Sequence, residues 1–212
     1  MNKIFPSAIL LQSILLLFSC TQPTQHMNLQ TGDILFCSYQ TGELSNAINE
    51  VTQTEKATNY SHMALVELVG TDTFVIHASL KRGVVKETLN KFLQVDQPTI
   101  VDNYRLVDSL QFSVQAAIIK ANRWVGLPYN SHYIMNDTSY YCSQLVFEAF
   151  KANNIFSLEP MTFKNPATDE FNDGWIKYYE SLGIEIPEGE PGCNPNGLAT
   201  SKNLKFVGNL NS

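Results

Sequence analysis

The order in which strand-like and helix-like segments follow one another constrains the fold of this chain most strongly. Five short apolar runs typical of strands lie in the first half, at residues 32–38, 62–69, 73–80, 83–89 and 99–107. Apart from one helical pattern at 42–53, the clear helical patterns come later, at 113–126 and from about 139 to 153. Strands grouped ahead of helices indicate an α+β domain, with an antiparallel sheet packed on helices.

Two of the strand-like runs form a predicted hairpin that carries two histidines. The turn-prone sequence "GTD" joins them, His62 opens the first run and His77 lies inside the second. Because side chains alternate between the faces of a strand, the two histidines share a face if residue 62 pairs with residue 77 or 79. Glu67 has odd spacing from His62 and is expected on the opposite face. A slip of one residue in the pairing would separate the histidines.

The N-terminus has the layout of an export signal. One early lysine precedes an apolar run from Ala8 to Phe18, which is too short to span a bilayer. The run ends in "LFSC", which resembles a bacterial lipobox in which Cys20 is lipidated. We therefore expect an exported protein of the cell envelope, anchored to a bacterial membrane through Cys20. The alternative is a plain secretory signal cut nearby, which would leave Cys20 unmodified.

Composition divides the rest of the chain into three parts. Residues 21–31 are polar and suit a tether, and residues 32–155 hold the strand and helix patterns of the predicted catalytic domain. Residues 156–212 are rich in loops, with a short helical pattern near "GWIKYYESLG", and are expected to pack on the same domain. The net charge is −6 and the body of the chain has no run of Lys and Arg, so a nucleic-acid partner is not expected.

The cysteine count leaves one thiol unexplained. With Cys20 lipidated, Cys37, Cys142 and Cys193 remain, and an odd number leaves at least one of them unpaired. A bridge between Cys37 and Cys193 is one option that the sequence leaves open. The spacing of the Cys and His residues matches no zinc pattern, so neither a metal nor another cofactor is expected.

Cys142 has two interpretations. Polar residues Asp137, Thr138 and Ser139 are good N-caps and would place Cys142 in the first turn of a helix. Free backbone N–H groups and the positive end of the helix dipole favour a thiolate there. Against this, apolar residues follow Cys142 at helical spacing, which is typical of a buried stripe in which a cysteine only packs. A nucleophilic cysteine needs a base, and His62 is the candidate, with His77 to orient it.

Several short motifs, taken in order, resemble a known family. They are "GDILF", "YSHMALV", "FVIHAS…GVV", "GLPYN" and "YYCSQLV". This series is similar to the permuted papain-like amidases of the YiiX/YebB type, which are relatives of the NlpC-type cell-wall peptidases. The resemblance implies a circularly permuted papain-like fold, in which the strand bearing the histidine precedes the helix bearing the cysteine.

The resemblance also implies roles for individual residues. Cys142 matches the nucleophile, His62 the base and His77 the third residue, where many members have Glu. Tyr129 and Tyr141 are expected to line the substrate pocket. His132, in a polar loop, is at best a group on the substrate side.

The expected function is therefore hydrolysis of an amide through a Cys–His acyl-enzyme, with a peptide or acyl-amide substrate that could derive from the cell wall. Two alternatives stay open at this stage. One is lipid acyl hydrolysis or transfer on the same scaffold, and the other is a binding module that has lost catalysis.

Overall fold

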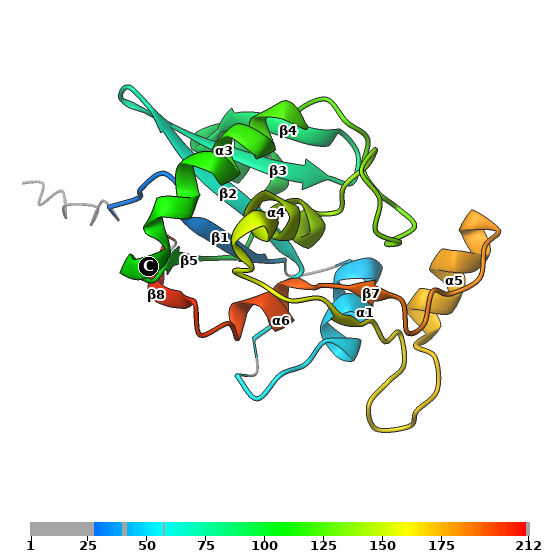
Figure 1. Cartoon of the computed structure of the whole chain (residues 1–212). Coiled ribbons are helices and arrows are strands. Elements are labelled where there is room, and N and C mark those ends of the chain that lie inside the picture. Colours follow the sequence, from blue (N-terminus) through cyan, green and yellow to red (C-terminus); the bar gives the residue numbers. More distant parts are fainter. Residues whose placement is uncertain (1–27, 40–41, 57, 211–212) are drawn as a thin grey trace, which may run out of the picture.

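A six-stranded antiparallel sheet forms the centre of the molecule (Figure 1). The computed structural model describes residues 28–39, 42–56 and 58–210. The strands lie in the order β4-β3-β2-β1-β5-β8. Their bounds are Ile34–Ser38 (β1), His62–Val69 (β2), Asp72–Ser79 (β3), Gly83–Thr88 (β4), Ile100–Leu106 (β5) and Leu204–Asn209 (β8). The α+β class and the antiparallel sheet predicted from the sequence are confirmed.

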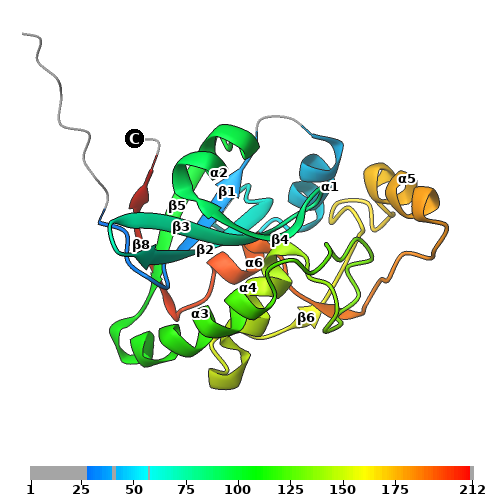
Figure 2. The ribbon, with the colours of Figure 1, turned by 90° about the horizontal axis from the view of Figure 1, so that it is seen from above.

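Helices cover both faces of this sheet. The main helices are α1 (Glu43–Val51), α2 (Leu89–Asp96), α3 (Val114–Arg123), α4 (Cys142–Phe150) and α5 (Asp173–Leu182). Figure 2 shows α2 on one side of the sheet and α3 with α4 on the other. The larger hydrophobic core lies on the α3–α4 side, and a smaller core lies around Phe92 of α2. Within the described ranges, no helix is long and apolar enough to cross a membrane.

Short elements complete the chain. They are the 3₁₀ segments η1 (Asp108–Ser113) and η2 (Lys151–Asn153), the two-stranded pair β6 (Glu159–Pro160) and β7 (Pro191–Gly192), and the short helix α6 (Pro195–Ala199). The segment after residue 155 packs on the same core as the rest. The Trp175 indole donates to the carbonyl of Ala47 at 3.2 Å, and the Asn196 side chain accepts from the backbone N–H of Tyr60 at 2.9 Å. These bonds tie the C-terminal segment to α1 and to the residues before β2.

The sequence did not predict α2 or β8. The strand-like run at 83–89 ends one residue early, because the Thr88 hydroxyl accepts from the N–H of Lys91 and caps α2. The helix has only eight residues and directly follows the strand, with Leu89 belonging to both the strand-like run and the helix. Strand β8 lies at the edge of the sheet, where Phe206 and Val207 are exposed, and it lacks the alternation of a half-buried strand.

The predicted N-caps of α4 are also corrected. The cap residue is Tyr141, which has extended backbone angles, and the Gln144 side chain accepts from its backbone N–H. The polar residues before it fold instead around Asn136, whose side-chain oxygen accepts from the backbone N–H groups of Thr138 and Ser139. Such a turn competes with helix capping for the same polar side chains. Cys142 nevertheless occupies the first helical position, as predicted.

Candidate active site

Helix α4 directs its first residue, Cys142, at the beginning of β2. The Cys142 sulfur lies 4.0 Å from the carbonyl oxygen of Ser61, the residue immediately before His62. The backbone N–H groups of Ser143 and Met63 also face the sulfur. The thiol is therefore held between the start of the helix and the two residues that flank His62.

Burial decides the protonation state of this thiol. Only 6% of Cys142 is exposed, and this burial raises its pKa to about 11, although the surrounding N–H groups act in the opposite direction. The position in the first turn was expected to favour a thiolate, but desolvation outweighs the N–H groups. At neutral pH the Cys142 thiol is protonated, so its use as a nucleophile requires a nearby base.

His62 and His77 lie on the same face of the β2–β3 hairpin and are hydrogen-bonded. Leu65 of β2 pairs with Ile76 of β3, and continuing this register along the two strands places residue 62 opposite residue 79. The Nε2 atom of His62 lies 2.9 Å from Nδ1 of His77. Glu67 points to the other face, where it accepts from the Asn122 side chain of α3.

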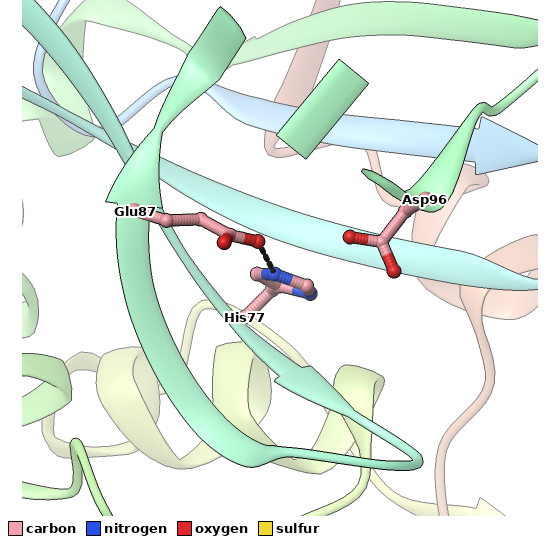
Figure 3. A group of neighbouring side chains, drawn as sticks. All are labelled: His77, Glu87 and Asp96. Carbon is pink, nitrogen blue, oxygen red and sulfur yellow. Dashed lines mark hydrogen bonds and ion pairs between the residues drawn. The ribbon is translucent and has the colours of Figure 1, made fainter. Parts of the chain in front are cut away.

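The hydrogen-bonded chain continues to a carboxylate on β4. The Nε2 atom of His77 lies 3.0 Å from Oε1 of Glu87, and both side chains are buried (Figure 3). Despite its burial, the pKa of Glu87 is lowered to about 2, because Arg82 and His77 donate hydrogen bonds to it and Arg82 adds its charge. Glu87 is therefore ionised at neutral pH and can only accept hydrogen bonds.

This acceptor fixes the tautomers of both histidines. Because Glu87 accepts, His77 carries its proton on Nε2, and its Nδ1 atom must accept from His62. His62 then carries its proton on Nε2, which leaves a lone pair on its Nδ1 atom. The ionised carboxylate of Glu87, which is linked to His62 through His77, thus orients the ring of His62 so that Nδ1 can act as a base.

Aromatic rings enclose the two imidazoles. Phe92 stacks on His62 with 6.2 Å between ring centroids and packs edge-on against His77 at 4.9 Å. Tyr39 lies on another side of His62, at 6.3 Å. The pKa of His62 is lowered well below the usual value, first by burial and then by unfavourable electrostatic interactions with His77 and Arg82. His62 is consequently neutral at physiological pH, as a general base must be.

Arg82 holds the carboxylate in place. Its guanidinium binds both oxygens of Glu87, at 2.7 and 2.9 Å, and also donates to Asp96 at 2.8 Å. Lys91 approaches Glu87 from the surface, at 3.4 Å. The two-pronged contact with Arg82 fixes the rotamer of Glu87 and hence the direction of its bond to His77.

His77, Glu87 and Asp96 together have a donor set that could hold a metal ion. Their ligand atoms lie within 4.8 Å of one another (Figure 3). The guanidinium of Arg82, however, already binds both carboxylates, and together with Lys91 it balances their charge. A cation would have to displace this group and break the bond between His77 and Glu87. The arrangement therefore fits an ion-pair cluster that supports the histidines and does not fit a metal centre.

Four other residues were singled out from the sequence: Tyr129, Tyr141, His132 and Cys20. The Tyr129 hydroxyl lies 3.2 Å from that of Tyr133, and the Tyr129 ring is partly buried near α4. Tyr141 is 1% exposed, and its hydroxyl accepts from the backbone N–H of Cys193. Its expected contact with the substrate stays a prediction. His132 is exposed on a loop. Cys20 lies outside the described residues.

The three cysteines of the domain are free and buried, so the optional bridge between Cys37 and Cys193 is not formed. Cys37 lies on β1 directly opposite His62 of β2. Cys193 packs against Tyr141, and its carbonyl accepts from the Ser143 hydroxyl at 2.9 Å. Among the three thiols, only Cys142 lies at the start of a helix.

Sequence reasoning missed Glu87, Arg82 and Asp96. A signal for Glu87 was present, since β4 pairs with β3 so that Val85 lies opposite His77, and alternation puts residue 87 on the same face as residue 85. Arg82 and Asp96 carried no such signal, because they come from a turn and from the end of the unpredicted helix α2.

Comparison with known proteins agrees with this fold. Residues 28–208 match the family described as permuted papain-like amidase enzymes, YaeF/YiiX, C92 family, and the chain belongs to this family. It is therefore a cysteine hydrolase of the papain-like class that acts on amide bonds. Among solved structures, it is similar to a protein described as metalloprotein YiiX from Escherichia coli O157:H7, with a TM-score of 0.66 and 22% identity. That match covers 84% of this chain and 96% of the other, and it shows the same fold. No curated protein matches the chain.

Proposed function

We propose that Cys142 is the nucleophile and His62 the general base of the amide hydrolysis that defines the family. Two observations support this most strongly: the hydrogen-bonded chain from His62 through His77 to Glu87, and the approach of the Cys142 sulfur to the carbonyl of Ser61, the residue before His62. A structural histidine pair would not need an ionised, arginine-bound carboxylate behind it.

The proposed reaction has two halves. Nδ1 of His62 takes the proton of the neutral Cys142 thiol as the sulfur forms a bond to the substrate carbonyl carbon. Backbone N–H groups at the start of α4 hold the oxygen of the tetrahedral intermediate. His62 then gives the proton to the leaving nitrogen, and the amine departs. In the second half His62 takes a proton from water, the hydroxide attacks the thioester, and the acid leaves with Cys142 restored as a thiol.

Within this mechanism His77 and Glu87 are positioning residues. His77 holds the ring of His62 in the tautomer that has a free Nδ1 atom. When His62 becomes an imidazolium, the negative charge of Glu87 stabilises that positive charge electrostatically. His77 lies between the two groups and is hydrogen-bonded to both. A neutral histidine alone would stabilise an imidazolium less than a carboxylate does, and Glu87 supplies that negative charge behind His77.

Replacing Glu87 by glutamine is expected to lower kcat/KM by about 100-fold, at the low end of the range for a general base. The amide keeps the shape but removes the charge, and its NH₂ group can donate to His77 and so reverse the tautomers along the chain. Steady-state kinetics on an amide substrate measure the loss. Glu67→Gln is the matched control, because Glu67 is paired with Lys86 on the opposite face, and it should retain nearly full activity. Equal losses in both variants would show that the effect is general destabilisation.

The pH dependence follows from the lowered pKa of His62. The base acts only when neutral, and its pKa in the folded protein lies well below 6.5. Activity should therefore stay constant as the pH falls through 6.5 and should be lost only at clearly lower pH. A kcat/KM profile measures this acid limb. A midpoint at or above pH 6.5 would contradict the assignment of His62 as a buried neutral base.

For the substrate and location, we propose cell-wall peptides processed at the cell envelope, with the chain anchored through a lipid on Cys20. The export-like N-terminus and the resemblance to NlpC-type peptidases support this. The test is to incubate the protein lacking residues 1–20 with purified cell-wall peptides and to identify the released amines by mass spectrometry. Labelling of the full chain with a radioactive fatty acid in bacteria, compared with Cys20→Ala, tests the anchor. Unchanged peptides would exclude this substrate class, and equal labelling of both chains would exclude lipidation at Cys20.

A further inference from the structure

The chain enters the folded domain at one end of the sheet. The Thr31 hydroxyl accepts a hydrogen bond from the backbone N–H of Leu68, near the tip of the β2–β3 hairpin, at 3.0 Å. Gly32 lies so close to Val114, at the start of α3, that a β-carbon on it would come within 2.4 Å of that side chain. Figure 1 and Figure 2 both place the hairpin tip, the start of α3 and β8 at this end of the molecule, with α5 at the opposite end.

This end carries a group of exposed apolar side chains, which we call the tether face. They come from the tip of the β2–β3 hairpin, from η1 just before α3 and from the edge strand β8, and they are Leu68, Val69, Phe112 and Phe206. Phe112 is 70% exposed and Phe206 57%, the two highest values among the large hydrophobic side chains that the structure describes. Exposed apolar side chains gathered at one end of a molecule indicate an interaction surface.

The charged side chains beside the tether face give it no positive character. Lys205 of β8 binds Asp108 of η1 at 2.6 Å, and Arg105 binds Asp33 at 2.5 Å. Asp72 on the hairpin is acidic and exposed. With a net charge of −6 on the whole chain, attraction to an anionic surface is not expected. The contact that this face can make is therefore apolar.

The length of the tether determines which end of an anchored domain faces the membrane. Eight residues lead from Cys20 to Asn28, where the described part of the chain begins. A polypeptide of this length spans at most about 28 Å, whereas a domain of this size is about 40 Å across. A chain anchored at Cys20 thus cannot turn the tether face to the side away from the bilayer.

We propose that the tether face rests on the bilayer surface, with Phe112 and Val69 inserted between the lipid head groups. This inference rests on the lipid anchor proposed above, which brings this end of the domain to the membrane. It goes further than the anchor, because a tether alone leaves the domain free to rotate, and apolar insertion gives it one orientation. A bilayer suits the face better than a second copy of the chain, since the tether already holds the face against lipid.

Docking in this way sets the position of the active site. His62 opens β2 and Val69 ends it, so the two residues are about 23 Å apart at 3.3 Å per residue. The catalytic pair is therefore held away from the bilayer, out of reach of the ester groups of membrane lipids. This orientation suits an amide substrate outside the membrane, such as the cell-wall peptides proposed above.

A chemical anchor allows the docking to be tested apart from natural lipidation. The chain beginning at Cys20 is coupled through that thiol to a maleimide lipid in phosphatidylcholine vesicles, since Cys37, Cys142 and Cys193 are buried. The vesicles are prepared with and without bromine on the acyl chains, because bromine quenches only those tryptophans that reach the bilayer. If Cys20 is not lipidated in bacteria, the anchor proposal fails and this measurement still reports on the face.

Tryptophan reporters placed on the face measure its insertion. Val69→Trp and Phe112→Trp should each shift tryptophan emission to shorter wavelength on coupling and show quenching by the brominated vesicles. Val95→Trp is the matched control, because Val95 has a similar exposure, 55% against 48% for Val69, and lies beside Asp96 of the catalytic cluster. Its quenching should equal that of the wild-type chain, whose two native tryptophans supply the background. Adding Phe112→Ser to Val69→Trp should reduce the quenching at residue 69.

Three results would overturn the proposal. Equal quenching in Val69→Trp and Val95→Trp would show that the anchored domain has no preferred orientation. Quenching no greater than in wild type would show that the face stays in water. Sedimentation of the uncoupled protein should give a monomer, and a dimer that Phe112→Ser dissociates would assign the face to a contact between two copies. Because Phe112 is 70% exposed, this substitution should keep the fold, which thermal unfolding checks.

Discussion

Replacing Cys142 by serine is expected to lower the rate of amide hydrolysis by at least about 10⁴-fold. The serine hydroxyl is a far weaker nucleophile than sulfur, and the pKa of a hydroxyl is too high for the neutral imidazole of His62 to deprotonate it readily. The substitution is nearly isosteric at a position that is 6% exposed, so the fold should be retained. Steady-state turnover of an amide substrate, with thermal unfolding measured in parallel, checks both statements.

Cys193→Ser provides the matched control for this prediction. Cys193 is also a free, buried thiol close to α4, and burial raises its pKa as well, to about 12. It lacks a position at a helix start and a neighbouring histidine, so its substitution should leave turnover within a few-fold of wild type. A comparable loss in both variants would mean that any buried thiol beside α4 supports the fold, and the assignment of Cys142 would then have to be abandoned.

Replacing His62 by alanine is expected to lower kcat/KM by about 10²- to 10⁴-fold, the range measured for general acid–base residues. The effect should be large because the Cys142 thiol is neutral in the resting protein, with a pKa of about 11, and only a small fraction is ionised without a base. The loss should shrink at high pH, where hydroxide ionises the thiol directly. A pH series of kcat/KM in both proteins measures this convergence.

His132→Ala is the control for the base, since His132 lies on an exposed loop and its side chain takes no part in the chain of hydrogen bonds. Activity close to wild type is expected. If His132→Ala loses as much activity as His62→Ala, the base has been assigned to the wrong histidine.

Several parts of this account could be predicted from the sequence, because they rest on local patterns. The strand-like runs at 62–69 and 73–80, with the turn between them, were enough to predict the hairpin. The shared face of His62 and His77 was predicted only for one pairing register, and the structure has that register. The apolar stripe after Cys142 was enough to predict α4, and the polar residues before it placed Cys142 in the first turn, although the capping residue is Tyr141 and not one of the predicted residues. These features depend on periodicity and on a single turn, which a sequence shows directly.

Other parts depend on contacts between distant segments and could not be predicted in this way. Arg82 and Asp96 meet beside Glu87 because a turn and the end of a short helix pack together. The protonation of Cys142 depends on how deeply the start of α4 is buried, which helix position alone does not determine. The hydrogen bond between the Tyr141 hydroxyl and the backbone N–H of Cys193 also depends on how the C-terminal segment packs.

The central claim, that Cys142 is a nucleophile activated by His62, is tested most directly by trapping the acyl-enzyme. The protein lacking residues 1–20 is mixed rapidly with a p-nitrophenyl ester, and the early release of p-nitrophenolate is followed while the acylated peptide is identified by mass spectrometry. The account predicts a burst close to one equivalent with the acyl group on Cys142, a burst slowed at least about 10²-fold in His62→Ala, and none in Cys142→Ser. Acylation of Cys37 or Cys193 instead, or the same burst rate with and without His62, would contradict it.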